Sequence, residues 1–175
     1  SVLDNFHYTV YVPTNESIDR LIADGRLHTW DDVAALDTTV AGQKERYEAY
    51  VQEINDFLRY HIQDNAIVIG ADNTAASDSV DATGLVSTEY ETALLDRRNR
   101  TFCKLTVKTD KAGSQILVTD RAGNQRRVMT GATGLYNLMA REYTYGGTDK
   151  STATILHNSS SVVVHLIDGP LMIEN

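Results

Sequence analysis

The chain has 175 residues, a size typical of one globular domain, and a chain of this length buries roughly two thirds of its unfolded surface. Hydrophobic residues make up 42% and charged residues 23%, which excludes a disordered or fibrous class. The formal net charge of -8 repels phosphate backbones, and no apolar run approaches the length of a membrane-spanning helix. Nucleic acid is therefore not an expected partner.

The first part of the chain predicts a strand followed by two short helices. Residues 7–12 alternate in β-rich chemistry, and Pro13 ends that strand. Thr14 or Asn15 then caps a short amphipathic helix, which a glycine stops. A second helix is expected to begin near residue 29 or 31, with Trp30 among its first apolar contacts.

A longer helix is predicted from residue 43, after a loop over residues 37–42. Its apolar stripe at helical spacing consists of Tyr47, Tyr50, Val51, Ile54, Phe57, Leu58 and His61. Because His61 closes this stripe, its ring is expected to point inward and to be hydrogen bonded.

The rest of the chain is predicted to be mainly β. Strands are expected at residues 66–69, 102–109, 115–119, 125–129, 161–167 and 171–173, and short helical segments at residues 90–95 and 135–141. Residues 72–83 predict a polar loop, and residues 120–124 have the turn chemistry of a hairpin. Because strands and helices are segregated rather than alternating, the sequence predicts an α+β fold.

Two histidines are the main candidates for chemistry. His61 and His165 could bind a metal if their segments meet, or one of them could serve a hydrolase together with an aspartate. No third metal ligand can be identified, and the common nucleophile and nucleotide motifs are missing. We therefore expect two satisfied core histidines, with no catalytic residue, no cofactor and no metal. Cys103, the single cysteine, is expected to be a small buried hydrophobe.

Two charged clusters have alternative interpretations. The acidic cluster consists of Asp72, Asp78 and Asp81. These residues could bind calcium, but their spacing matches no EF-hand, so a solvated loop is the favoured interpretation. The basic cluster consists of Arg97, Arg98 and Arg100. We favour its interpretation as a solvated surface patch, and an anion-binding site is the alternative.

Three segments, in this order, resemble the landmarks of fasciclin (FAS1) domains. Residues 8–15 resemble the first motif, a strand that ends in a proline and a Thr-Asn pair that opens a helix. Residues 58–61 are similar to the central Tyr-His motif, and residues 158–173 are similar to the second motif. Residues 90–95 also resemble the segment that follows the central motif. Together these segments span nearly the whole chain.

The resemblance implies that the first and last motifs are adjacent central strands, with His61 packed behind them. The implied fold is a fasciclin-like small β-sandwich or wedge with helices packed on one side. The motif residues, structural or partner-binding, would be Thr9, Pro13, Thr14, Asn15, Tyr60, His61, Asn158, His165, Ile167 and Asp168.

The resemblance also implies a non-catalytic adhesion or protein-binding module outside the cytoplasm, secreted or anchored at the cell surface. Its partner would be a protein or glycan of the cell surface or matrix, and membrane association would come only from an anchor outside this chain. The lack of disulfides and the insertions favour a bacterial surface protein, such as an outer-membrane lipoprotein.

The chain departs from the family pattern in two ways. Few residues precede the first strand, whereas fasciclin domains begin with helical structure, so we expect residues 1–175 to be one domain with a truncated N-terminal part. Residues 26–46 and 143–152 look like insertions, where specific binding would reside. The alternative function is a carbohydrate or small-ligand binding module of a bacterial cell envelope, with Trp30, Tyr143 and Tyr145 stacking on sugars.

Overall fold

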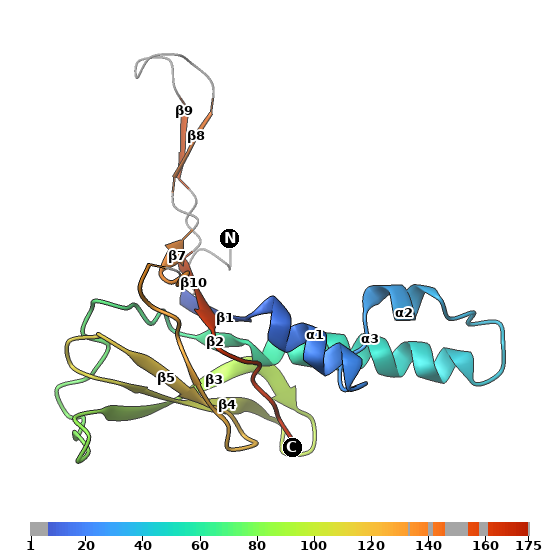
Figure 1. Cartoon of the computed structure of the whole chain (residues 1–175), viewed down its shortest axis with the longest axis horizontal. Helices are drawn as coiled ribbons and strands as arrows, with labels where there is room; N and C mark the ends of the chain where they lie inside the picture. The colour runs from blue at the N-terminus through green and yellow to red at the C-terminus, as the bar shows by residue number, and fades with distance from the viewer. Residues whose placement is uncertain (1–6, 133, 140–141, 146–153, 158–160, 175) are drawn as a thin grey trace.

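The computed structural model describes residues 7–132, 134–139, 142–145, 154–157 and 161–174 (Figure 1). The helices are α1 (Asn15–Ala23), α2 (Trp30–Ala34) and α3 (Gln43–Tyr60). The strands are β1 (His7–Pro13), β2 (Ile62–Asp64), β3 (Val86–Asp96), β4 (Thr101–Thr109), β5 (Ile116–Thr119), β6 (Gln125–Arg127), β7 (Leu138–Met139), β8 (Glu142–Tyr145), β9 (Thr154–His157) and β10 (Ser161–Ile167). The fold class is α+β, as predicted.

One mixed sheet dominates the fold. Its eight strands lie in the order β6-β5-β4-β3-β2-β1-β10-β7, and β1 pairs with β10 in parallel while the other neighbours are antiparallel. Beyond β6, Val128 forms a bridge with Ile167 of β10, and the N–H of Met129 donates to the Leu166 carbonyl over 2.8 Å. These contacts curl the sheet into a nearly closed barrel. β8 and β9 form a separate two-stranded ribbon that lies away from it (Figure 1).

The three helices lie together beside the sheet (Figure 1). The helices pack against one another because each carries apolar side chains on one face. The buried residues of the cluster between them are Leu21, Leu27, Val33 and Ile54. α2 begins at Trp30, close to the predicted start, and Thr29 caps it: its hydroxyl accepts from the N–H of Asp32 (3.1 Å), and the Asp32 carboxylate accepts from the N–H of Thr29 (2.7 Å). At the last residue of α3, Tyr60 enters the larger core of the sheet.

The predicted stripe of α3 is confirmed at Ile54 and His61 and wrong at Tyr47 and Leu58. Ile54 and His61 are buried, whereas Tyr47 and Leu58 are 38% and 51% exposed. The first turns of α3 project away from the sheet (Figure 1).

The helical turn predicted for residues 90–95 is wrong, because these residues belong to β3 and pair with β4. The register shifts between Glu91 and Leu95, which marks a β-bulge. In the bulge, the Thr92 hydroxyl donates to the Cys103 carbonyl over 2.9 Å, so a side chain replaces part of the ladder.

The helix predicted for residues 135–141 is wrong in its described part. Leu138–Met139 forms β7, which pairs with β10. Asn137 precedes it with a φ of 52°, a left-handed conformation that an α-helix does not contain. The chain therefore turns at Asn137 and joins the edge of the sheet.

The strands predicted for residues 66–69 and 171–173 are also wrong. These segments are apolar and buried or half-buried, but neither joins the sheet. Their backbone donors are satisfied by side chains instead of strand neighbours, at Ile67, Val68, Ile69, Leu171 and Met172. Hydrophobic patterning detects the burial of such segments and cannot detect where their N–H groups go.

Candidate functional site

The first and last motifs are adjacent, as the resemblance implies. β1 and β10 run in parallel and in register from His7 opposite Ser161 to Pro13 opposite Ile167. Parallel neighbours cannot be joined by a tight turn, so the whole intervening chain separates these two strands. The other motif residues are described below by their contacts with this strand pair and with the segments around it.

His61 lies at the C-terminal end of α3 and is 4% exposed. Its Nδ1 lies 2.8 Å from the Phe57 carbonyl, and its Nε2 accepts a hydrogen bond from the N–H of Leu171 over 3.0 Å. Because Nε2 accepts, the proton is on Nδ1 and donates to Phe57. Burial lowers the pKa of His61 to about 4, since a charged ring would be poorly solvated there.

His165 on β10 is fully buried and is held in the opposite tautomer. Its Nδ1 accepts from the N–H of Asn137 (3.2 Å), and its Nε2 donates to the Ile67 carbonyl (2.7 Å). Burial lowers its pKa as well. Each histidine thus has its own backbone partners, and the part of the chain that the structure describes holds no group of three ligands for a metal ion.

Thr9 on β1 ties the same segment to the sheet. Its hydroxyl donates to the Asn65 carbonyl over 2.8 Å and accepts from the N–H of Ile67 over 2.9 Å. Thr9 is fully buried, so both bonds are shielded from water. Thr9 and His165 therefore fix both polar groups of Ile67, and both motif residues are architectural.

The remaining motif residues surround the β1–β10 pair. Pro13 is half-buried at the end of β1, Thr14 is the N-cap of α1, and Asn15 is exposed in its first turn. The Thr14 side chain makes no cap hydrogen bond. Ile167 is fully buried, and the exposed Asp168 accepts from the N–H of Arg127 over 2.9 Å. Asn158 lies outside the described residues.

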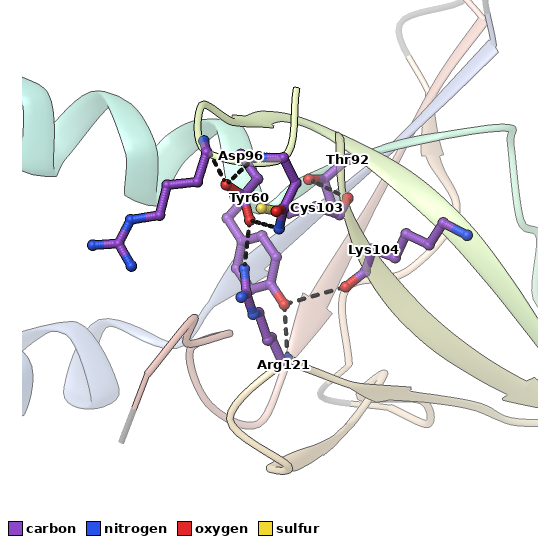
Figure 2. A network of polar contacts seen from close by, with 8 residues as sticks. Tyr60, Thr92, Asp96, Cys103, Lys104 and Arg121 are labelled. Atoms are coloured by element: carbon purple, nitrogen blue, oxygen red, sulfur yellow. Dashed lines mark hydrogen bonds and ion pairs between the residues drawn. The ribbon is translucent and has the colours of Figure 1, made fainter. Parts of the chain in front are cut away.

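Tyr60 joins the end of α3 to two parts of the sheet (Figure 2). Its hydroxyl accepts from the N–H of Arg121 (2.8 Å) and donates to the Lys104 carbonyl (3.3 Å). The side chain is 1% exposed, and burial raises the pKa of its hydroxyl to about 12. The Arg121 guanidinium reaches back to the Asp96 carboxylate over 3.2 Å, which completes the network.

Asp120 holds the segment after β10, and sequence reasoning missed this role. Its carboxylate accepts from the N–H of Met172 (2.7 Å) and from the N–H of Asn124 (2.7 Å), and it is 6% exposed. Its place as the first residue of the β5–β6 turn was the available signal, because a turn aspartate bonds to backbone N–H groups.

Two adjoining hollows of about 290 and 310 Å³ lie around this network. They share Asp96, Cys103 and Arg121. Cys103 is buried at their base, as predicted, and burial raises the pKa of its thiol. A third hollow of about 440 Å³ lies between α3 and residues 171–174. Neither His61 nor His165 lines any of these three hollows.

The aromatic platform of the alternative function is not assembled. Trp30 is 56% exposed on α2, and β8, which carries Tyr143 and Tyr145, lies at a different end of the molecule (Figure 1). The tyrosine side chains lie outside what the structure describes. Trp30 on α2 therefore does not lie beside the strand that carries these two tyrosines.

Two members of the acidic cluster, for which calcium binding was the alternative interpretation, bond to neighbouring residues of their own loop. Asp72 accepts from the N–H and hydroxyl of Thr74, and Asp81 accepts from those of Thr83. The bonds to Asp81 lower its pKa to about 2. Such short-range bonds are those of turn aspartates, which supports the interpretation as a solvated loop.

No family model and no curated protein matches the chain. The resemblance to fasciclin domains thus stays a prediction that rests on the motifs themselves. Among the described residues, no helix is both long and apolar enough to cross a membrane.

Proposed function

We propose that the chain is a non-catalytic binding module of the fasciclin type, which acts in adhesion at the cell surface or in the surrounding matrix. The observation that carries the proposal is the parallel pairing of β1 with β10, together with the buried His61, whose carbonyl accepts from the N–H of Tyr11 on β1 over 2.9 Å. The three motifs, far apart in sequence, lie together, which is the arrangement that the resemblance implies. The fasciclin-like wedge is the part of this proposal that goes beyond the α+β class.

The state of the two histidines supports binding rather than catalysis. A general base needs a free acceptor within reach of a substrate proton. In His61 and His165, the nitrogen without a proton already accepts from a backbone N–H, and both rings are buried. Their chemistry is therefore used in holding the fold.

The expected partner is a protein or a glycan at the cell surface or in the matrix, and the proposed location is outside the cytoplasm. A bacterial lipoprotein or another anchored protein would present the module in this way.

The test combines a binding assay with an activity assay on the purified chain. We expect saturable binding to at least one component of a panel of immobilised matrix proteins and surface glycans. We also expect no turnover of ester, glycoside or peptide substrates. Turnover that His165→Gln abolishes while the fold is retained would replace the proposal with a hydrolase. Absence of binding to every component of the panel would also contradict it.

A further inference from the structure

The turn between β3 and β4 carries an unusual concentration of positive charge for this protein. Residues 97–100 form the turn and contain Arg97, Arg98 and Arg100, all of them exposed. The whole chain has a net charge of -8, so this arginine turn differs in sign from the average surface. We call these four residues the arginine turn.

Neighbouring carboxylates do not neutralise the arginine turn. Asp96 pairs with Arg121 (3.2 Å), and Glu89 pairs with Lys104 (3.2 Å). Arg97 donates to the uncharged side chain of Gln52 over 2.7 Å. In the described part of the chain, no ion pair involves any of the three arginines of the turn. Their charge is therefore available to an anionic partner.

Apolar surface lies directly beside this charge. Leu95 and Phe102 are opposite each other on β3 and β4, and they are 43% and 46% exposed. An aromatic ring in such a place offers a flat face to a ligand, and it does so with little loss of conformational entropy.

The two hollows described above adjoin the arginine turn on both sides. Arg97, Arg98 and Leu95 help to line the first, and Phe102 and Lys104 help to line the second. Both hollows include the Arg121 side chain, so a single extended molecule can occupy both. Carboxylates line both hollows as well, and the acidic groups of a ligand must therefore lie towards the arginine turn. These carboxylates are Asp56 and Glu174 in the first hollow, Glu89 and Asp120 in the second, and Asp96 in both.

We propose that the arginine turn and its two hollows bind a linear acidic polysaccharide, whose carboxylate or sulfate groups accept hydrogen bonds from the arginines. A guanidinium binds both groups with paired hydrogen bonds, and Phe102 provides a face for a sugar ring. This inference rests on the proposed function as a binding module and names the chemistry of its partner.

The shape and lining of the hollows favour a polysaccharide over other polyanions. Two adjoining hollows fit a chain of repeating units better than a single small ion. Their polar lining includes Asn99, Thr101 and Thr119, whose side chains can bond to sugar hydroxyls but do not suit acyl chains of a lipid. One turn of three arginines is also small beside the basic surfaces that nucleic acids require.

The experiment is calorimetric titration of the whole chain with oligosaccharides of defined length. The probes are a heparin octasaccharide with sulfate and carboxylate groups, a polygalacturonate octasaccharide with carboxylates alone, and uncharged dextran. We expect binding to at least one acidic probe and none to dextran. The affinity should fall when ionic strength rises from about 20 to about 200 mM, because salt screens exposed charges.

Charge reversal identifies the surface. The variant Arg98→Glu/Arg100→Glu should bind the acidic probe at least about tenfold more weakly, because two attractive contacts become repulsive. The matched control Arg46→Glu/Arg59→Glu makes the same change in net charge at exposed positions of α3 and should keep most of the affinity. Phe102→Ala should cause a smaller loss of about threefold.

Several outcomes would overturn the proposal. Equal losses in the turn variant and the α3 control would assign the effect to net charge. Tighter binding to anionic phospholipid vesicles, single-stranded DNA or an acidic peptide would identify another class of partner. Absence of binding to both acidic probes would contradict it as well. If the chain still bound a matrix protein in that case, the proposed function would stand and this inference alone would fail.

Discussion

The region around the two histidines and the arginine turn use polar residues in opposite ways. In the first region, the rings of His61 and His165 are buried and both nitrogens of each ring have partners. In the second, the charged side chains are exposed and form no ion pair among the described residues. The motif residues that attract attention in the sequence thus hold the fold together. Available binding chemistry lies in a turn without any motif.

Removing the Tyr60 side chain should give the largest effect. Tyr60→Ala should lower the free energy of unfolding by about 4 kcal/mol, because it opens a cavity and leaves the Arg121 N–H and the Lys104 carbonyl without a partner. Urea denaturation measures this change. The control Tyr47→Ala, at a half-covered ring on the same helix, should lose far less. Similar losses for both variants would refute the contrast between buried and exposed positions.

Acidification should weaken the histidine region next. The folded pKa of His61 is about 4 against an ordinary value of 6.5, so the unfolded chain binds more protons between these pH values. The contribution of His61 is fully present above about pH 6.5, and roughly 3 kcal/mol of it is lost as pH falls to about 4. His165, whose pKa is also lowered, changes stability in the same direction.

Unfolding measured at several pH values would test this dependence. His61→Met keeps a side chain of similar size but cannot titrate, so its stability should vary less with pH than that of the parent chain. Replacement of exposed His7 by Gln is the matched control and should leave the slope unchanged. An identical slope in the parent chain and His61→Met would mean that His61 does not contribute to it.

Asp120→Ala should have an intermediate effect. The substitution removes the acceptor for the N–H groups of Met172 and Asn124 and should cost about 2 kcal/mol. Hydrogen exchange should show faster exchange at Met172, because this N–H loses its described acceptor. Unchanged exchange at Met172 would indicate that the segment after β10 is held by other contacts.

The smallest effect on stability is expected at the arginine turn. Arg98→Ala/Arg100→Ala should change the free energy of unfolding by less than about 0.5 kcal/mol, since neither side chain has an ion-pair partner in the described chain. Thermal unfolding, with the parent chain measured alongside, is sufficient to test this. A large loss would show that the turn is structural and would weaken its assignment as a binding surface.

Local patterns predicted much of the fold. β1 followed from alternation and Pro13, and the β5–β6 hairpin followed from its turn chemistry. The expected helix start near residue 29 or 31 matches α2. The adjacency of β1 and β10 came from the family resemblance, because nothing within either strand identifies its partner. The whole chain as one domain stays a prediction.

The errors share one physical cause, which is competition from contacts distant in sequence. Helix-forming residues in 90–95 were drawn into β3 because β4 offers a long ladder of partners. The apolar residues of 66–69 stay outside the sheet because Thr9, Asn73 and Asn137 take their N–H groups. The buried state of His61 was predicted from helical periodicity, whereas its bond to Leu171 depends on a segment 110 positions away.

The parallel pairing of β1 and β10 has a mechanical consequence. Force applied to the start of β1 and the end of β10 pulls the two strands past each other along their length. The evenly spaced bonds from His7 opposite Ser161 to Pro13 opposite Ile167 then share the tension and must break together. An antiparallel hairpin pulled apart from its open end would release its bonds one after another. If the module is tethered at one end of the chain and bound to a partner at the other, the β1–β10 pair would resist the shear force between them.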